Sequence, residues 1–196
     1  MLASITPLGE RARGHSWSVT AAIYVLGAAL GGAAIGTATS MLGLLVLGGM
    51  QLSVRLGLVA AALAAGFAWE LAGRRVPGPR RQVDERWLTR YRRWVYATGY
   101  GVQLGAGIFT IVVSSSVHVI WMASFAAGQP GLGAVIGTGA GAMRGASVLM
   151  AARVVSPDRL RALHKLMAAR EESTRRLTLV AQIGLATIAT LVTVSA

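Results

Sequence analysis

The stretch "GLGAVIGTGAGAMRGASVLMAAR", residues 131–153, decides the fold class because it holds one charge inside an otherwise apolar and small-residue run. Arg144 stands in the middle of this run, and the next cation is Arg153. Apolar runs of about 18 residues or more with few or no charges are typical of membrane-spanning helices. The stretch therefore predicts a transmembrane helix over residues 132–152 with an arginine inside it.

The composition of the whole chain also indicates a membrane protein. Of the 196 residues, 54% are hydrophobic and 13% are charged, whereas a soluble domain has about 25% charged residues. No Asp, Glu, Lys or Arg lies between His15 and Arg55 or between Arg93 and Arg144. The net charge of +12 raises a nucleic-acid partner as another class, but the arginines flank apolar runs, where membrane proteins carry them. We therefore expect the protein to associate with the lipid bilayer and not with nucleic acid.

The apolar runs predict a single all-α integral membrane domain over residues 1–196, a glycine-rich bundle of about five transmembrane helices. The predicted spans are 17–47, 56–73, 94–125, 132–152 and 177–194. Two polar connectors separate them, a basic loop over 74–93 and a segment over 156–172 whose leucines and arginines predict an amphipathic helix. The cations of the N-terminal segment and of both connectors fall on one side of five spans. The positive-inside rule therefore predicts a cell membrane protein (plasma or inner) with its N-terminus cytoplasmic and its C-terminus outside.

The position and direction of Arg144 follow from its neighbours. It lies nine positions before Arg153, which at about 1.5 Å per residue places it about 13 Å deep, near the middle of a hydrocarbon layer about 30 Å thick. A lone arginine there costs at least about 2.5–3.5 kcal/mol. Arg144 shares a helical face with glycines that recur every fourth residue, a spacing typical of close helix packing. These are Gly133, Gly137, Gly141 and Gly145.

Two interpretations of Arg144 stay open at this point. In the first, it binds an anionic group or lines a polar path through the bundle. In the second, its long stem brings the guanidinium toward the cytoplasm, or the guanidinium bonds backbone carbonyls of a neighbouring span. Glu70, the one acid inside a predicted span, is either its counter-charge or the helical i,i+4 partner of Arg74.

Further path candidates lie on the predicted span 94–125. Gln103, Thr110 and Ser114 fall close to one helical face, and His118 lies just off it. Such a stripe indicates either a hydrated path or interhelical hydrogen bonds, and the second is the commoner use of serine and threonine. The chain has no cysteine and shows no Ser/His/Asp group, carboxylate pair or metal-ligand spacing. We therefore expect no enzyme, no cofactor and no metal site.

The order of the apolar runs resembles a known family. The runs are "HSWSVTAAIYVLGAALGGAAIGTA" (15–38), "GYGVQLGAGIFTIVVSSSVHVIW" (99–121) and "GTGAGAMRGASVLMAARV" (137–154). Their order resembles the cytochrome-c biogenesis membrane proteins of the CcdA/DsbD type and, more distantly, LysE and TauE-type exporters. The resemblance implies six spans in two inverted repeats, with Arg144 near the central site of such a fold. It also implies a thiol relay, which a chain without cysteine cannot perform.

The resemblance and the residues together predict two classes of function. The first is a transporter or exporter of a small, possibly anionic solute, with CcdA/LysE-like architecture and without thiol chemistry. The alternative is a non-catalytic membrane subunit or assembly factor, in which a second copy or a second membrane subunit completes the repeat symmetry.

Overall fold

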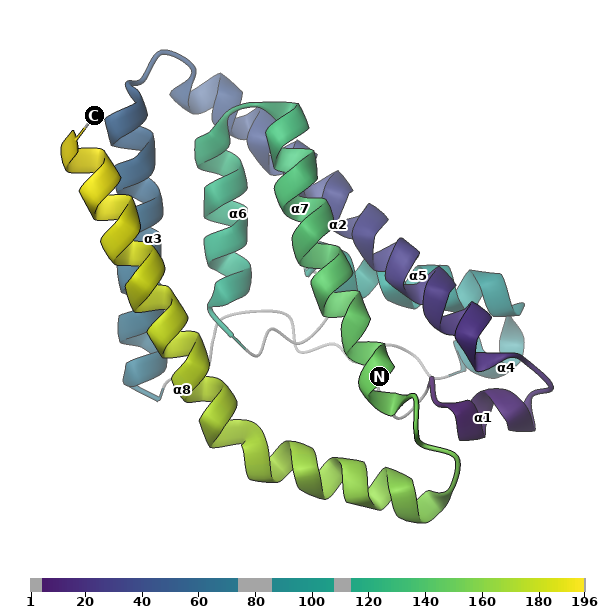
Figure 1. Ribbon diagram of the computed structural model, residues 1–196. Helices are drawn as coiled ribbons and strands as arrows, with labels where there is room; N and C mark the ends of the chain where they lie inside the picture. Colours follow the sequence, from purple (N-terminus) through teal and green to yellow (C-terminus); the bar gives the residue numbers. More distant parts are fainter. Residues whose placement is uncertain (1–4, 74–85, 108–113, 196) are drawn as a thin grey trace.

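The computed structural model describes residues 5–73, 86–107 and 114–195, and within these ranges every regular element is helical (Figure 1). The helices are α1 Pro7–Ala12, α2 Trp17–Leu47, α3 Leu52–Leu71, α4 Trp87–Arg90, α5 Arg93–Ala106, α6 Ser116–Ala127, α7 Pro130–Ala146, the 3-10 helix Ser147–Ala151 and α8 Pro157–Ser195. The predicted all-α class is confirmed.

Helix α2 is the centre of the bundle because it packs against α5, α6 and α7. Its contact with α7 is a contact between backbones. A Cβ placed on Gly32 would overlap the carbonyl oxygen of Gly137, and a Cβ on Gly137 would overlap that of Gly32. Gly36 and Gly133 face each other in the same way, one turn further along. Small residues spaced four apart on both helices permit this approach, which is typical of helix packing in membranes.

A second glycine contact joins α2 to α5. A Cβ on Gly101 or Gly105 would overlap a backbone carbonyl of α2, at Tyr24 and Ala28 respectively. On the other side, Gly31 of α2 lies against the backbone of Val102. Helix α2 therefore uses one glycine-rich face for α7 and another for α5, which explains why so much glycine is tolerated in a long helix.

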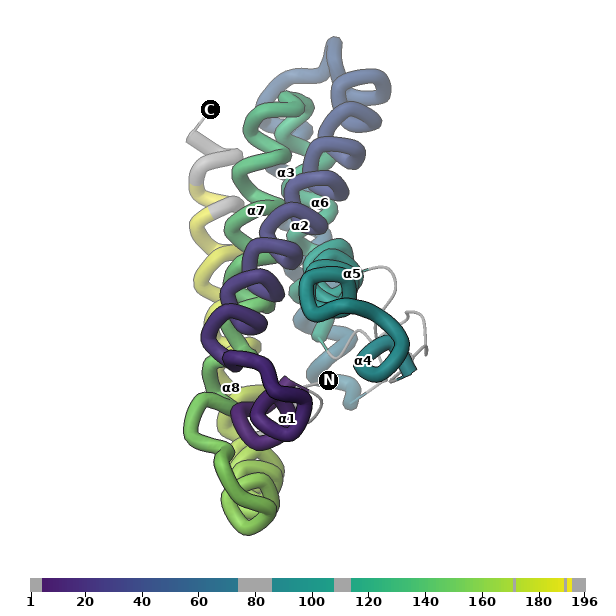
Figure 2. Tube along the Cα trace, turned by 90° about the vertical axis from the view of Figure 1, so that its right-hand side faces the viewer, coloured from purple at the N-terminus to yellow at the C-terminus, as the bar shows by residue number. Residues whose placement is uncertain are grey.

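Helices α3 and α8 form a pair that joins the rest of the bundle mainly through contacts between α3 and α6. Helix α8 is 39 residues long and bent (Figure 1). Its first half lies across the end of the bundle where α1 lies, and its second half runs beside α3; Figure 2 shows α1 and this first half at the same end. The predicted surface helix 156–172 and the predicted span 177–194 are thus two arms of one helix.

The predicted span 94–125 is divided between two helices. Helix α5 ends at Ala106, where the C-cap Gly107 takes the left-handed conformation (φ 71°) that favours glycine, and α6 begins at Ser116. At about 1.5 Å per residue, helices of 14 and 12 residues reach only about 21 and 18 Å, short of a layer about 30 Å thick. Figure 2 shows α5 almost end-on, so it crosses the direction of α6 instead of continuing it.

Three helices of the described residues are long and apolar enough to cross a membrane. They are Trp17–Leu47, Leu52–Leu71 and Pro130–Ala151, the last including the 3-10 turn. Length and composition therefore support a membrane protein, whereas the predicted number of about five spans is not confirmed.

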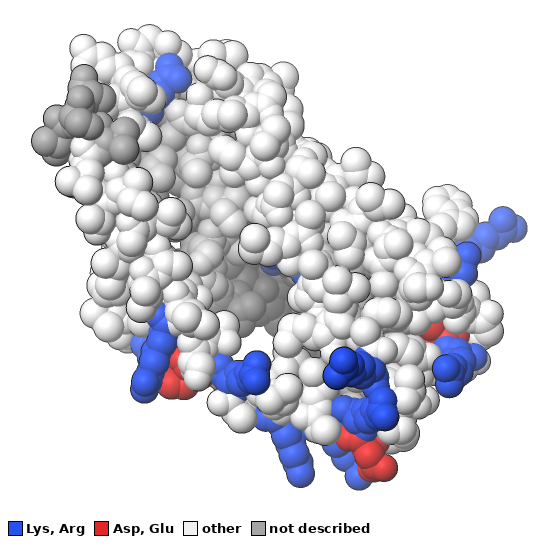
Figure 3. All heavy atoms as spheres, in the orientation of Figure 1, with Lys and Arg blue, Asp and Glu red and all other residues white. Residues whose placement is uncertain are grey.

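Charge is distributed unequally between the two ends of the molecule. On the face shown in Figure 3, cations gather along the lower edge and lower right, over the first half of α8 and the region of α1 and α4, whereas the upper part shows little positive charge. At the end of α2, Arg55 donates hydrogen bonds to the carbonyl oxygens of Leu47 (2.7 Å) and Gly48 (3.1 Å). The predicted basic loop 74–93 lies mostly outside the described residues, which resume at Arg86.

Candidate functional site: the two ends of a divided helix

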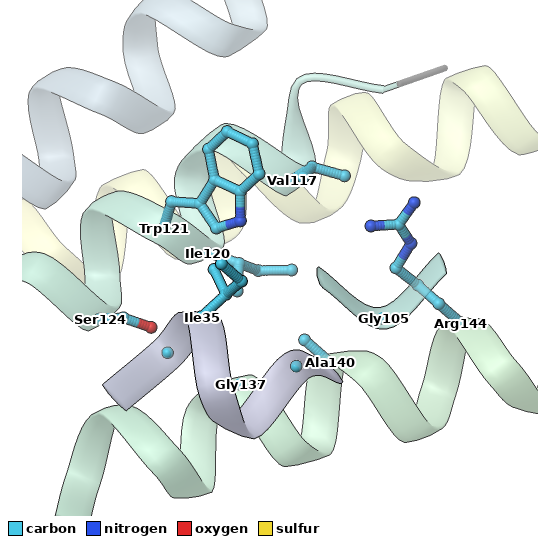
Figure 4. A pocket seen from close by; sticks show the side chains of 11 residues that line it. Ile35, Gly105, Val117, Ile120, Trp121, Ser124, Gly137, Ala140 and Arg144 are labelled. Carbon is cyan, nitrogen blue, oxygen red and sulfur yellow. The ribbon is translucent and has the colours of Figure 1, made fainter. Parts of the chain in front are cut away.

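Arg144 projects from α7 into a small cavity between helices. The cavity is lined by residues of α2, α5, α6 and α7. Figure 4 shows the guanidinium directed into this cavity toward Val117 of α6, and Trp121 lies next to Val117 on the same helix. The side chain is half-buried. The cavity measures about 20 Å³, enough for about one water molecule, because a water needs about 10–15 Å³ of such space. This volume leaves no room for an organic solute in the conformation described.

The guanidinium of Arg144 lies beside the C-terminal end of α5. A Cβ on Gly107, the C-cap of α5, would fall 2.7 Å from Arg144 Nη1. The last carbonyls of a helix have no partner within the helix and carry partial negative charge, so a cation there is stabilised by up to about 2 kcal/mol when partly buried. Within residues 5–73, 86–107 and 114–195, no carboxylate forms an ion pair with Arg144. The end of α5 therefore contributes partial negative charge beside the guanidinium.

Glu70 lies at the N-terminal end of α6, the second helix of the divided span. Its Oε1 accepts hydrogen bonds from the backbone N–H of Ser115 (2.7 Å), from the Ser115 hydroxyl (2.6 Å) and from the Ser114 hydroxyl (2.9 Å). Ser115 is the N-cap of α6. A carboxylate at this position is favoured because the first N–H groups of a helix are unpaired and carry partial positive charge. The alternative partner that the sequence suggested for Glu70, Arg74, lies outside the described residues.

Arg144 and Glu70, the two charged residues predicted inside the spans, thus lie at the two helix ends that face the break between α5 and α6. Arg144 lies at the C-terminal end of α5, and Glu70 lies at the N-terminal end of α6. Discontinuous helices of transporters use such half-helix ends to bind substrate and ions. Here side chains of the chain itself already occupy both ends. The arrangement explains why one acid and one base are kept in apolar segments without forming an ion pair with each other.

The other predicted path residues are separated by the division of the span. Gln103 lies half-buried on α5, whereas Ser114 lies beside Glu70 at the start of α6. His118 on α6 contacts Trp121 edge-on, with ring centroids 5.3 Å apart. Thr110 lies outside the described residues. The polar side chains expected along one face of one helix are therefore divided between α5 and the start of α6.

Sequence reasoning missed a buried acid near the N-terminus. Glu10 of α1 is 0% exposed and accepts hydrogen bonds from Thr20 (2.7 Å), from Tyr96 (2.8 Å to Oε2) and from Arg13. Burial by itself raises the pKa of Glu10, but these hydrogen bonds and the charge of Arg13 outweigh it, so the pKa lies below its ordinary value. The bonds fasten α1 to α2 and α5.

One sequence signal would have helped to find this cluster. Thr6 caps α1 by accepting a hydrogen bond from the Gly9 N–H (3.1 Å), and Pro7 takes the first helical position. This pattern predicts a short helix that carries Glu10, although not its burial. Elsewhere in the described part of the chain, no group of three or more His, Asp or Glu side chains is placed to hold a metal ion.

Comparison with known proteins finds a curated relative that is similar to part of the chain. Over 129 residues, the chain is 33% identical to the methylamine utilization protein MauF of Paracoccus versutus. The matched region is 64% of this chain and 47% of the relative, so the chain spans about half the length of MauF. No protein-family model matches the chain, and no solved structure matches it either.

These findings correct the family suggested by the sequence. The relative is a methylamine utilization protein and not a protein of the CcdA/DsbD or LysE/TauE type, so the predicted resemblance is wrong. It rested on the order of the apolar runs and not on a sharp motif. The chain is therefore an all-helical, membrane-type protein that is similar over part of its length to MauF.

Proposed function

We propose that this protein is a multi-pass membrane protein that acts as a non-catalytic membrane subunit or assembly factor. The observation that carries the proposal is the occupation of both ends of the divided helix. Arg144 lies beside the end of α5, Glu70 accepts hydrogen bonds at the start of α6, and the cavity at Arg144 has room for about one water molecule. The close packing around Arg144 leaves little space for a solute at this site, which favours a role in holding a partner.

The similarity to MauF supports methylamine utilization as the process that this protein serves. The shared 129 residues are 64% of this chain. Because the chain spans about half of MauF, we propose only that it takes part in the same process, and we assign no reaction to it. The proposed partner is a second membrane protein of the same process or a second copy of this chain.

We propose further that the end of the bundle with α1 and the first half of α8 faces the cytoplasm. The gathering of cations at this end supports the orientation, since cytoplasmic segments next to spans carry an excess of Lys and Arg (Figure 3). The chain has no cysteine, so each introduced cysteine is unique. In whole cells, Gln51→Cys is expected to react with a membrane-impermeant maleimide, and Ala168→Cys only after permeabilisation; both positions are exposed. The reverse pattern would invert the topology.

The functional proposal is tested by deleting the gene in its host. The deletion strain is expected to grow normally on ammonium and to fail on methylamine as the sole nitrogen source, and the wild-type gene should restore growth. Protein tagged and purified in mild detergent from methylamine-grown cells is expected to form a complex of fixed stoichiometry. Normal growth on methylamine would remove the process assignment, and a monomer in detergent would remove the subunit role.

A transporter is the second candidate, and the divided helix is the observation that favours it. It requires a conformation in which Arg144 leaves the end of α5 and the cavity widens. Purified protein in vesicles would then accumulate labelled methylammonium or a small anion. Flux equal to that of empty vesicles for both solutes would end this candidate.

A further inference from the structure

The first half of α8 lies across the end of the bundle and touches the rest of the chain along one side only (Figure 1). We call residues 157–174 the α8 arm. Among its described side chains, Leu160 and Leu163 are half-buried and the others are exposed. The side of the arm that carries these two leucines therefore faces the bundle.

The level of the arm is marked by the end of a candidate membrane span. Helix α3 ends at Leu71, and Arg175 of α8 donates a hydrogen bond to the Glu70 carbonyl oxygen (2.8 Å). The second half of α8 runs beside α3 from this level on. Trp69, which is 38% exposed, lies at the same level, and tryptophan is enriched where a membrane meets water. The arm thus lies beyond the end of the span, at the depth of lipid headgroups.

An apolar stripe runs along the side of the arm that faces the bundle. Leu160, Leu163 and Met167 are spaced three and four apart, so they share one helical face. Met167 is 38% exposed, because it lies on this face where the bundle does not cover it. For a helix at the end of membrane spans, the side toward the bundle is also the side toward the hydrocarbon. Amphipathic helices of this kind lie in the headgroup layer with the apolar face toward the acyl chains.

The arm and its junction with the second half of α8 are basic. Residues 157–176 contain six Lys or Arg against three Asp or Glu. Arg170 follows Leu163 by seven residues, so it borders the apolar stripe, whereas Lys165 lies on the opposite side of the helix. The long stem of an arginine at such a border covers apolar surface while its guanidinium reaches a polar layer. A soluble acidic partner would approach the Lys165 side first, so the stripe and Arg170 together favour a lipid surface.

We propose that the α8 arm binds the headgroup layer of anionic phospholipids. Its apolar stripe turns toward the acyl chains, and Arg170 lies against lipid phosphates. The juxtaposition that carries the proposal is an uncovered apolar and cationic face at the level where α3 ends. Binding of this kind holds the bend of α8 against the membrane surface. It goes beyond the proposed subunit role and does not depend on it.

The experiment uses the full chain in lipid nanodiscs with an environment-sensitive fluorophore on a single cysteine. Met167→Cys places the fluorophore on the stripe. Ala169→Cys is the matched control, because it is exposed two residues later and about 200° around the helix. In phosphatidylglycerol nanodiscs, the probe at 167 is expected to be quenched by a lipid with a nitroxide high in its acyl chain and shielded from acrylamide in water. The probe at 169 is expected to show the reverse.

Two charge variants test the headgroup chemistry in the Met167→Cys background. Arg170→Gln should lower the ratio of shielded to accessible probe about five-fold in phosphatidylglycerol, since one cation near an anionic surface contributes about 1 kcal/mol. Lys165→Gln should lower it less, because a helix diameter of about 10 Å puts that cation about one Debye length further away. Phosphatidylcholine nanodiscs and high salt should both reduce the shielding of the probe at 167.

Several outcomes would overturn the proposal. Equal quenching at 167 and 169 would show that the arm does not lie on the lipid, and equal shielding in phosphatidylcholine and phosphatidylglycerol would remove the anionic headgroup. A loss in Lys165→Gln as large as in Arg170→Gln would place the contact on the other side of the arm. Shielding in native membranes but not in nanodiscs would assign the surface to a partner protein. Amide hydrogen exchange of residues 160–170 in the unlabelled protein, expected to be slower in phosphatidylglycerol, decides if a fluorophore disturbs the arm.

Discussion

Arg144→Ala is expected to destabilise the bundle by about 2 kcal/mol, which for a chain of this size lowers the melting temperature in detergent by about 4–8 °C. The variant removes the cation that lies beside the C-terminal end of α5, where the last carbonyls carry partial negative charge. It also enlarges a cavity whose apolar lining cannot hold several waters. The measurement is thermal unfolding of the purified protein.

Two variants control this result. Arg153→Ala removes the same charge at an exposed position and should change the melting temperature by no more than about 1 °C. Arg144→Lys keeps the charge on a shorter, compact head and should fall between the wild type and Arg144→Ala. If Arg144→Ala melts like Arg153→Ala, the arginine does not stabilise the divided helix. If the same variant then loses solute flux in vesicles, the transporter replaces the subunit as the better proposal.

Gly137→Ala is expected to have the larger effect on folding. The new Cβ would overlap the Gly32 carbonyl, so α2 and α7 would have to separate along their whole contact. Overpacking of a core costs about 1–3 kcal/mol and sometimes more, and here the obstacle is backbone that cannot change rotamer. We expect a loss of about 3 kcal/mol and a fall in the amount of protein recovered from membranes. The measurements are membrane yield and thermal unfolding.

The same helix offers a matched control. A Cβ on Gly139, two residues later, would meet no atom within 4 Å. Gly139→Ala should therefore be tolerated, and it can stabilise the helix because alanine has the higher helix propensity. Similar stability of the two variants would mean that α2 and α7 do not touch through their backbones, and the described centre of the bundle would be incorrect.

The local sequence was enough to predict the elements that are long and uniform. Helix α2 has the predicted bounds, 17–47, because no charge, proline or polar cluster interrupts it. Helix α7 with its 3-10 turn covers 130–151, close to the predicted 132–152. The glycines of α7 fall on the side that meets α2, as their spacing of four indicates, since residues four apart share a helical face.

The division of residues 94–125 could not be predicted from hydropathy. The run contains no Asp, Glu, Lys or Arg, and a window average of hydropathy does not register one glycine that adopts a left-handed conformation at Gly107. At the two helix ends that the division creates, Arg144 of α7 lies beside the last turn of α5 and Glu70 of α3 accepts hydrogen bonds at the start of α6. Those partners are far away in the sequence, and the contacts exist only in the folded bundle.

The sequence by itself determined that this protein is helical, apolar and of the membrane type, because length, hydropathy and glycine spacing act along one helix at a time. Only the tertiary structure decided what its few buried polar groups do: Glu10 holds α1 against α2, Arg144 lies beside the end of α5, Glu70 accepts hydrogen bonds at the start of α6, and the Gln182 amide donates to Ser115. The reason is that a polar group in an apolar interior is stabilised by the particular donor or acceptor that it meets. That partner is chosen by packing and not by its neighbours in the chain.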